Sequence, residues 1–331
     1  MTILYDSRWI GRFGIGRSAD ELQKLLPNLT PFQAQLPPSH PLDSMLLSAV
    51  LWRRKPDLFF SPGYNPPLSS PCPFVFTLHD LNHLRVPANS SAAKRAYYEY
   101  VIRPACRKAA CVLTVSEYSK IQIARWARIG EEKITNVSSG VGPPFGVEGS
   151  RHDPGYPYLL YVGNHKPHKN LARLLQAFAV SGICKDVYLV LTGRISSELH
   201  RQIASLHLDR SVVFLDKPAD EELARVYRGA LTLVFPSLYE GFGLPALEAL
   251  ACGVPVLTSA VCSIPEVVGD AGFLVDPLSV ESIAEGIKRL ADDAELRRQL
   301  AARGTVRASQ FSWAETARKT WRALELAGTT N

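Results

Sequence analysis

Two glutamates around a glycine-rich turn are the residues of this chain whose types and spacing best suit chemistry. Glu240 and Glu248 flank the segment Gly-Phe-Gly-Leu-Pro-Ala-Leu, which contains Gly241 and Gly243. Glycines allow a ligand to approach the main chain closely, and carboxylates accept hydrogen bonds from hydroxyl groups. The segment therefore predicts a site for a ligand that carries several hydroxyl groups.

The backbone around these glutamates is predicted to bind an anion. A buried strand is expected at 230–236 and a helix at 244–251, whose second residue is proline, a position where proline is preorganised. A helix that begins here leaves unpaired backbone N–H groups, those of Phe242, Gly243 and Leu244. An anion site beside two carboxylates suits a nucleotide sugar, which carries both phosphate and hydroxyl groups.

The same segment resembles the paired-glutamate motif of retaining family-4 glycosyltransferases of the GT-B fold. The resemblance implies that Glu240 binds the transferred sugar and that Glu248 binds the ribose hydroxyls of the donor. It also implies an α/β fold of two Rossmann-like domains whose parallel sheets face each other across a cleft. Shorter family members with a similar Gly-Asn-x-Lys-Pro loop resemble bacterial mannosyltransferases of polysaccharide assembly, which favours GDP-mannose as the donor.

Two other loops of the C-terminal half resemble donor-binding segments of that family. The loop at 162–171 follows a predicted strand and opens a helix. The resemblance assigns Lys169 to the diphosphate of the donor, where its charge would stabilise the leaving group. Lys166 is expected to supply a second positive charge. After the next strand, Gly193 is implied to let the backbone approach the donor, and Arg194 is a further phosphate candidate.

The N-terminal half contains a glycine loop that superficially matches a dinucleotide fingerprint. Its glycines begin about eight residues after the first predicted strand, too late for the tight turn of that fingerprint, and no acidic residue follows the second strand at the expected distance. A nicotinamide dehydrogenase is therefore rejected. The loop resembles the family's loop over the donor phosphates, which implies roles for Gly14 and Gly16, with Arg17 as a supporting cation that could also serve the acceptor.

A His-Asp pair lies at the carboxyl end of a predicted buried strand, where the cleft is expected. The resemblance assigns His79 to a hydrogen bond with the transferred sugar. Asp80 is expected to orient the imidazole or to bind an acceptor hydroxyl. Together with Glu240 and Lys169, His79 completes the residues to which we assign catalysis.

Buried strands alternate with helical stretches throughout, which predicts an α/β architecture with parallel sheets. The predicted elements include strands at 58–61, 188–192, 212–215 and 272–275, a helix at about 171–180, and a helix at about 117–126 with Ser116 as its N-cap. A stretch rich in proline and glycine at 143–157 is typical of an interdomain linker. We therefore expect an acceptor-side domain at 1–150 and a donor-binding domain at 151–311. The resemblance implies that the last helix, 312–328, packs back on the N-terminal domain. A single polar helix is expected at about 282–303.

Composition describes a soluble globular protein, with 46% hydrophobic and 21% charged residues among 331. No apolar run approaches the roughly 20 residues needed to cross a bilayer, and the N-terminus has no signal-peptide pattern. We therefore expect a cytoplasmic protein. The six cysteines include no Cys-x-x-Cys pair, which favours free thiols.

The net charge of +6 is concentrated in the first half of the chain, where 17 Lys and Arg face 11 Asp and Glu in residues 1–150. Such a balance favours contact with an anionic membrane surface or a pyrophosphate-bearing lipid, or is simply a solvated basic surface. The basic runs Arg53–Lys55 and Lys94–Arg95 are the candidates for peripheral membrane contact. No nucleic-acid-binding motif accompanies the charge, so nucleic acid is not expected.

No Asp-x-Asp segment of the kind that holds Mg²⁺ or Mn²⁺ is present, and Asp292-Asp293 is expected to be solvated within a polar helix. We expect no metal and no cofactor. The resemblance implies a front-face displacement onto a saccharide or lipid-linked saccharide. Three alternatives stay open: a nucleotide-sugar epimerase or phosphorylase of the same fold, a UDP-sugar donor, and a non-enzymatic subunit that binds sugar nucleotides.

Overall fold

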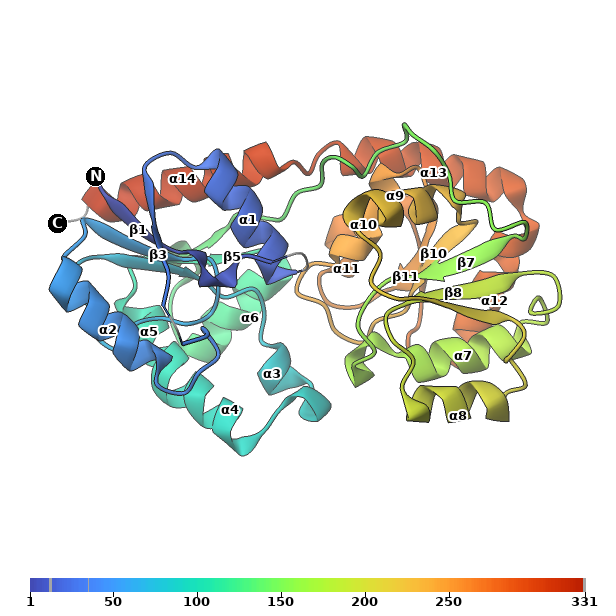
Figure 1. The fold of residues 1–331 in the computed structure, drawn as a ribbon, viewed down its shortest axis with the longest axis horizontal. Helices are drawn as coiled ribbons and strands as arrows, with labels where there is room; N and C mark the ends of the chain where they lie inside the picture. Colours follow the sequence, from blue (N-terminus) through green and yellow to red (C-terminus); the bar gives the residue numbers. More distant parts are fainter. Residues whose placement is uncertain (12–13, 35, 330–331) are drawn as a thin grey trace. The chain divides into compact units, whose positions relative to one another are not determined.

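Two compact units, each built on one parallel β-sheet, make up the chain in this computed structural model (Figure 1). The N-terminal unit comprises Met1–Gly140 and the segment from Ser312 onward, and the C-terminal unit comprises Val141–Phe311. The structure describes residues 1–11, 14–34 and 36–329.

The sheet of the N-terminal unit has six parallel strands in the order β2-β1-β3-β4-β5-β6. Its middle strands are runs of apolar residues, as expected for strands covered by helices on both faces. Strand β1 pairs with β2 on one side and with β3 on the other, and from β3 onward the strands follow in chain order. The topological switch point of the sheet therefore lies between β1 and β3. The strands are β1 (Ile3–Asp6), β2 (Leu29–Phe32), β3 (Leu58–Ser61), β4 (Phe74–Thr77), β5 (Cys111–Thr114) and β6 (Ile134–Asn136).

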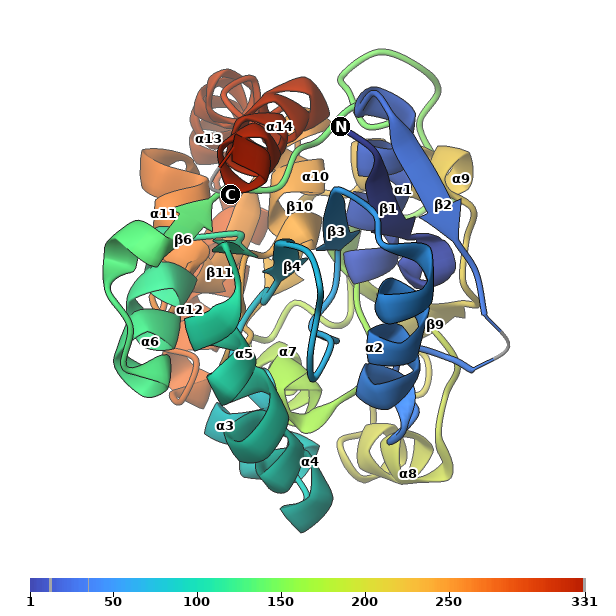
Figure 2. The same cartoon turned by 90° about the vertical axis from the view of Figure 1, so that its left-hand side faces the viewer.

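Helices cover both faces of this sheet, and alternate residues of each strand enter two different cores. Ile3 and Tyr5 pack with Leu324 under α1 (Ile15–Leu25) and α14 (Trp313–Thr329). Leu4 packs with Leu47 on the opposite face. That face is covered by helices visible in Figure 2, namely α2 (Asp43–Arg54), α5 (Arg103–Lys108) and α6 (Glu117–Ala127). The chain's last helix therefore completes the core of its first domain.

The sheet of the C-terminal unit has six parallel strands in the order β12-β11-β10-β7-β8-β9. Its first strand, β7, lies between β8 and β10, so the topological switch point falls between β7 and β10. The strands are β7 (Tyr158–Tyr161), β8 (Tyr188–Thr192), β9 (Val212–Leu215), β10 (Thr232–Phe235), β11 (Val256–Ser259) and β12 (Gly272–Val275).

The helices of this unit also pack on both faces of its sheet. On one face α7 (Leu171–Val180), α8 (Ser197–Ser205) and α12 (Val280–Asp292) bury their apolar sides against alternate strand residues such as Leu159 and Leu191. The helix α10 (Leu244–Ala251) packs against β10 and β11 and contacts three further helices (Figure 1), which are α9 (Asp220–Gly229), α11 (Ile264–Val268) and α13 (Ala294–Ala308).

Several expected elements differ from those observed. The single helix expected at 282–303 is wrong, because α12 ends at Asp292 and α13 begins at Ala294. Asp293 lies between them and caps α13, since its carboxylate accepts the backbone N–H of Leu296 at 2.9 Å. Asp293 is therefore a helix cap rather than a solvated residue within one helix.

Two short helices and two edge strands complete the N-terminal unit. The helix α3 (Asn82–Arg85) follows β4, and α4 (Ala92–Tyr97) continues through a π-helical turn, Tyr98–Ile102, into α5. The strands β2 and β6 are sheet edges that were too short and too polar to be predicted.

Candidate functional site

The loops that follow β7 and β10 lie side by side because these two strands are neighbours in the sheet, with Thr232 opposite Leu159. Carboxyl ends of parallel strands at a switch point are where open α/β sheets bind ligands. The two loops bring Lys169 and Glu240 together, although 71 residues separate them in the chain, with Nζ 2.7 Å from Oε1. Each side chain is only 11% exposed. Two residues predicted from separate motifs are therefore one ion pair.

Lys169 is held by the residue that follows it. Asn170 begins α7 in the left-handed conformation, at φ 63°, which asparagine tolerates better than most residues. Its buried amide donates to the carbonyls of Pro236, at 2.9 Å, and Pro277, at 2.6 Å. The ammonium of Lys169 also lies over the ring of Phe235, 5.0 Å from its centroid. Asn170 is a positioning residue that the sequence analysis did not assign.

The loop that carries Glu240 is fixed from both sides. On one side, Leu238 donates its backbone N–H to the carbonyl of His168 at 2.7 Å. On the other, the hydroxyl of Ser263 donates to the carbonyl of Glu240 at 2.9 Å. Such main-chain bonds hold the carboxylate in place before any ligand binds, which is the preorganisation that electrostatic catalysis requires.

The N-terminus of α10 follows Glu240 directly, as predicted, and Gly243 is its N-cap at φ 106°. No side chain caps this helix start among the described residues. A Cβ at Gly243 would lie 2.6 Å from Cδ1 of Ile264, so the position has neither the conformation nor the space for a side chain. Phe242 is buried, whereas Leu244, the first helical residue, is half-buried. The backbone N–H groups here remain the predicted anion site.

Glu248 lies in the second turn of α10 and is buried. The hydroxyl of Tyr227, on α9, donates to its Oε2 at 3.0 Å. The edge of the Tyr227 ring meets Phe145, with ring centroids 6.0 Å apart. The sequence analysis missed Tyr227 because it did not predict α9, although the acidic run at 220–222 is typical of a helix start.

The loops after β7 and β8 contact each other through His165. Its Nε2 lies 2.9 Å from the carbonyl of Thr192, so this nitrogen carries the proton and donates it. Gly193 follows at φ 101°, with the His165 ring 3.2 Å from where a Cβ would lie. Lys166 is exposed on the same loop as His165.

Arg194 forms an exposed ion pair with Asp216, at 3.0 Å, in which the two side chains are 78% and 52% exposed. Tyr161, in contrast, is buried beneath the β7 loop and donates its hydroxyl proton to the carbonyl of Asn164 at 2.7 Å. Burial, with a smaller effect from the Glu240 charge, raises the pKa of Tyr161 far above its usual value. Tyr161 therefore supports the loop as a neutral phenol.

In the N-terminal unit, His79 follows β4 and points Nε2 at the carbonyl of Pro62, 3.0 Å away. Because a carbonyl can only accept, Nε2 carries the proton and donates it. Burial lowers the pKa of His79, so the ring is neutral near pH 7 and its Nδ1 has a lone pair. A neutral His79 can accept a hydrogen bond from a hydroxyl group. Asp80 accepts the backbone N–H of Asn82 at 2.8 Å.

The glycine loop also differs from expectation, because α1 begins at Ile15 and Gly16 is helical. A Cβ on Gly16 would lie 2.8 Å from the backbone of Gly11, so this glycine permits close packing of helix and loop. Gly14 is the N-cap of α1, and Arg17 lies in the first turn. The intervening Arg12 and Phe13 are outside the described residues.

A buried charged network at the β1/β3 switch point was not predicted. Arg8 lies between two carboxylates, with Nε 2.8 Å from Asp6 and Nη1 2.5 Å from Asp43. Asn65 joins the same carboxylates through Nδ2, at 3.1 Å from Asp6 and 2.5 Å from Asp43. Trp9 donates its indole N–H to Asn65 at 2.5 Å. These residues come from segments up to 59 positions apart, so only the fold reveals the network.

An aromatic group extends from this network. The Trp9 ring lies 5.1 Å from that of Tyr64, and the Tyr64 ring lies 6.0 Å from that of His83. All three side chains are partly exposed. Half-exposed aromatic faces next to hydrogen-bonding groups suit a ligand with both apolar C–H and polar hydroxyl surfaces, as a sugar ring has.

Metal-binding clusters and membrane-spanning helices are both absent from the described residues. In the part of the chain that the structure describes, no three His, Cys, Asp or Glu side chains gather as they would around a metal ion. Among the same residues, none of the helices combines the length and the apolar character that a membrane span requires.

Known proteins resemble this chain over both units. The family model described as "Glycosyl transferases group 1" matches residues 147–307, and that described as "Glycosyltransferase Family 4" matches residues 9–143. The O-antigen chain mannosyltransferase B of Escherichia coli is 34% identical over 266 residues, which cover 76% of this chain and 70% of that protein.

A second relative and a solved structure extend the comparison. The serotype-specific mannosyltransferase WbdA of Escherichia coli is 29% identical over 227 residues, or 63% of this chain, but this chain spans only 28% of that longer protein. The crystal structure of Anabaena Alr3699/HepE in complex with UDP-glucose superposes with a TM-score of 0.80 at 20% identity, covering 98% of this chain and 99% of that one. The last comparison supports the two-domain fold alone.

Proposed function

Because this chain belongs to the group 1 glycosyltransferases and carries a family 4 domain at its N-terminus, we propose that it transfers a mannosyl residue from GDP-mannose to a saccharide or lipid-linked saccharide. The sugar is inferred from two Escherichia coli relatives that are both mannosyltransferases, one of them of the O-antigen chain. The GDP base is inferred from the resemblance of the loop at 162–171 to those of mannosyltransferases.

The observation that carries the proposal is the Lys169–Glu240 pair at the β7/β10 switch point, directly before the N-terminus of α10. We assign Lys169 and the backbone N–H groups of Phe242, Gly243 and Leu244 to the diphosphate of the donor. Glu240 would accept hydrogen bonds from the transferred hexose, and Glu248 from the ribose. The ammonium of Lys169 would then interact with both the Glu240 carboxylate and the donor diphosphate. The negative charge of the leaving group would thus be stabilised by a residue already in place.

We propose retention by front-face displacement. The bond between the anomeric carbon and the donor phosphate breaks, and a bond from that carbon to the acceptor oxygen forms on the same face. The acceptor hydroxyl passes its proton to the departing phosphate oxygen, so no protein base is needed. The protein contributes orientation and charge stabilisation, through Lys169 at the leaving group and through the neutral Nδ1 of His79 at a sugar hydroxyl.

Two further sets of residues are proposed to contact the donor or the acceptor because of where they lie in the fold. Lys166, Gly193 and Arg194 follow β7 and β8 and are proposed as outer contacts of the donor, Arg194 only after it releases Asp216. In the N-terminal unit, Gly14, Gly16, Arg17 and Asp80 stay candidates for donor or acceptor contact.

The proposal is tested by incubating the protein with GDP-mannose, UDP-glucose and UDP-N-acetylglucosamine and measuring nucleoside diphosphate release with and without a saccharide acceptor. We expect release from GDP-mannose that depends on the acceptor, and a rise in melting temperature with GDP larger than with UDP. Nucleoside diphosphate release from the UDP-sugars but not from GDP-mannose would reject GDP-mannose as the donor. An epimerase would instead convert the donor without an acceptor.

Two further measurements address mechanism. Proton NMR of the product should show the α-configuration of GDP-mannose preserved at the new linkage, and a β-linked product would reject front-face retention. Activity that is unchanged after treatment with EDTA is expected if Lys169 and the α10 N-terminus replace a metal ion, whereas its loss and recovery with Mg²⁺ would reject metal independence.

A further inference from the structure

The helix α2 carries an apolar stripe that none of the described residues of its own unit covers. Leu42, Met45 and Trp52 are 55%, 58% and 55% exposed, and Ala49 is exposed between them. Their spacing of three, four and three residues places them on one side of the helix. The other side, which includes Leu47 and Leu51, is fully buried against the sheet. The α2 helix therefore has two apolar sides, and only one contacts the core.

The loop that runs beside α2 extends this stripe. Leu68 is 43% exposed, and the backbone N–H of Leu68 donates to Ser48 Oγ at 3.0 Å, which fixes the loop along the helix. The indole N–H of Trp52 donates to Ser69 Oγ at 3.2 Å. The Trp52 ring is therefore held with one edge on the loop and the rest exposed.

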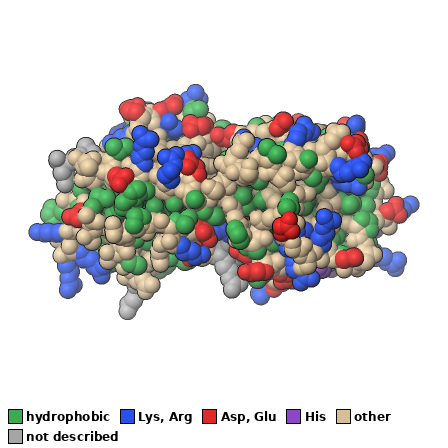
Figure 3. Space-filling view, turned by 90° about the horizontal axis from the view of Figure 1, so that it is seen from above, with side chains coloured by type: hydrophobic (Ala, Val, Ile, Leu, Met, Phe, Trp, Pro, Cys, Tyr) green, Lys and Arg blue, Asp and Glu red, His purple; other side chains and the backbone are tan. Residues whose placement is uncertain are grey.

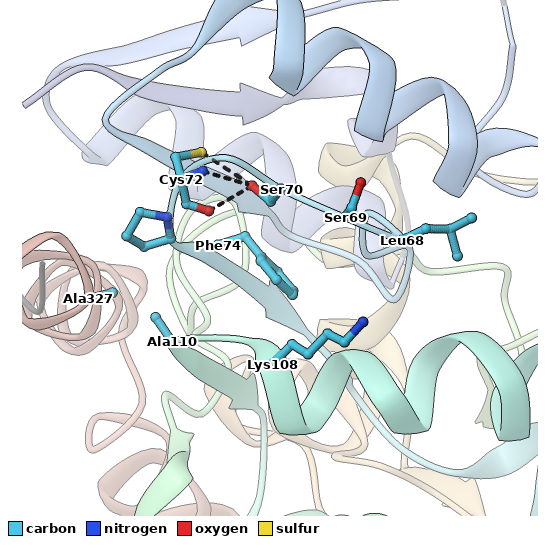
Figure 4. A pocket seen from close by; sticks show the side chains of 9 residues that line it. Leu68, Ser69, Ser70, Cys72, Phe74, Lys108, Ala110 and Ala327 are labelled. Atoms are coloured by element: carbon cyan, nitrogen blue, oxygen red, sulfur yellow. Dashed lines mark hydrogen bonds between the residues drawn. The ribbon is translucent and has the colours of Figure 1, made fainter.

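Positive charge surrounds this surface. Arg53, Arg54 and Lys55 end the helix and are all exposed. Lys108 lies at the edge of a cavity of about 450 Å³ under the same loop, where its side chain extends below Leu68 and Ser69 (Figure 4). In residues 41–56 and 62–73 the only carboxylate is Asp43, which is buried against Arg8. The exposed carboxylate of Asp57 follows Lys55 by two residues, and it accepts the backbone N–H of Thr2 at 2.6 Å and lies 3.9 Å from the N-terminal ammonium of Met1. On the face shown in Figure 3, by contrast, acidic and basic side chains are interspersed.

We propose that this surface, formed by Leu42, Met45, Trp52 and Leu68 with the cations Arg53, Arg54, Lys55 and Lys108, docks on an anionic lipid bilayer. Apolar side chains flanked by cations are the combination that inserts shallowly into the headgroup region, and tryptophan prefers that interface. A protein partner would need acidic groups matched to these particular cations, whereas an anionic bilayer presents negative charge over any such surface.

The other basic run is a poorer candidate. Lys94 donates to the carbonyl of Asn89 at 3.0 Å, and Arg95 donates to Ser90 Oγ at 3.0 Å, so both heads bond to the protein. Glu99, on the next helical turn, is exposed and forms an ion pair with Arg103. We therefore assign membrane contact to α2 and not to α4.

The first test measures co-sedimentation of the full chain with vesicles of phosphatidylcholine, with and without phosphatidylglycerol. We expect binding that requires phosphatidylglycerol and weakens with salt. Each cation near the surface contributes roughly five-fold to partitioning, so Arg53→Gln/Arg54→Gln/Lys55→Gln should lower it about a hundred-fold. Arg201→Gln/Arg210→Gln/Arg298→Gln removes three exposed cations of the C-terminal unit and should leave binding nearly unchanged. Equal losses in both triple variants, or equal binding to both vesicles, would overturn the proposal.

The second test uses the position of Trp52, the exposed one among the five tryptophans, all of which are described. Anionic vesicles should shift its emission to shorter wavelength, and Trp52→Phe should remove the shift. Met45→Ser/Trp52→Ser should weaken binding more than Leu278→Ser/Val306→Ser, which changes exposed apolar residues elsewhere. Emission that does not shift with anionic vesicles would overturn the proposal. A dimer in buffer that dissociates in Met45→Ser/Trp52→Ser would also overturn it, because the surface would then be a contact between two copies of the chain. Neither test depends on transferase activity.

Discussion

At the residue scale, the Lys169–Glu240 ion pair holds two opposite charges in fixed positions at the candidate site. Both side chains are mostly removed from water, and a 2.7 Å contact satisfies each of them. Removal of one partner leaves the other charge without compensation in a site of low dielectric, which costs more than the pair itself contributes. The same arrangement gives a binding site whose charges need no rearrangement when a phosphate arrives.

We expect Lys169→Met to lower kcat/KM by about 10²- to 10³-fold, because one charge opposite the leaving group is lost. It should also lower the free energy of unfolding by about 2–3 kcal/mol, since Glu240 is left unpaired. Donor turnover and urea unfolding followed by circular dichroism measure the two effects. The double variant Lys169→Met/Glu240→Gln should regain stability but not activity. Additive destabilisation in the double variant would show that the pair is not coupled.

His79 makes stability depend on pH in a definite direction. Burial lowers the pKa of the folded ring below its unfolded value of 6.5, so the unfolded chain binds the extra proton more readily. The stabilisation is complete above pH 6.5 and is lost as the pH falls through the folded pKa. We expect the unfolding free energy to decrease from pH 7.5 to pH 5.5 by more in the natural protein than in His79→Gln, as measured in urea. Parallel curves would contradict a lowered pKa of His79 in the folded protein.

At the scale of elements, the turn from β10 into α10 combines an anion site with a conformational requirement. Gly243 adopts φ 106° and approaches Ile264. The loop before it is held by the Leu238 N–H, which donates to the carbonyl of His168, and by the Ser263 hydroxyl, which donates to the carbonyl of Glu240. The turn therefore keeps its shape through backbone geometry, which a side chain at Gly243 would disturb.

We expect Gly243→Ala to cost about 1–3 kcal/mol in stability, because an L-residue is strained at this φ. It should also weaken GDP-induced thermal stabilisation, because the backbone N–H groups of the proposed anion site shift. Gly155→Ala is the matched control, since Gly155 also has positive φ, 82°, but open space around it. Gly243→Ala/Ile264→Val separates steric from conformational strain. An unchanged response to GDP in Gly243→Ala would exclude this turn from the donor site.

At the scale of the whole molecule, the N-terminal unit is completed by the last helix of the chain. Leu324 of α14 is fully buried in the same core as Ile3 and Tyr5 of β1. All five tryptophans, at positions 9, 52, 126, 313 and 321, belong to this unit. Tryptophan fluorescence therefore reports the unfolding of one unit without signal from the other.

We expect Leu324→Ala to lower the stability of the N-terminal unit by about 2–5 kcal/mol, because it removes buried apolar groups and leaves a cavity. Fluorescence-detected urea unfolding measures this change. Leu326→Ala on the same helix should have almost no effect, because Leu326 is 62% exposed. Equal midpoints for the two variants would mean that α14 does not stabilise the unit through Leu324.

Much of the fold followed from local patterns. The helices α7 and α10 and the strands β3, β8, β9 and β12 have the predicted bounds, because apolar runs and strong start signals act over a few residues. The capping serine of α6, Ser116, is confirmed by its bond to the backbone N–H of Ser119 at 3.0 Å. The helix α2 was missed because apolar residues on both of its sides obscure its periodicity, and α9 was missed because its start has no side-chain cap.

What the sequence determined by itself was the set of reactive residues and the strand–loop–helix segments that carry them. Glu240 and Glu248 were singled out by residue types and spacing within a short motif, and Lys169 by the resemblance of its loop to that of a known family. Only the tertiary structure decided that Lys169 contacts Glu240, that Tyr227 donates to Glu248, and that Arg8 lies between two carboxylates. Strand order decides such contacts, because it places the ends of distant segments at one edge of a sheet, and no local spacing encodes which strands become neighbours.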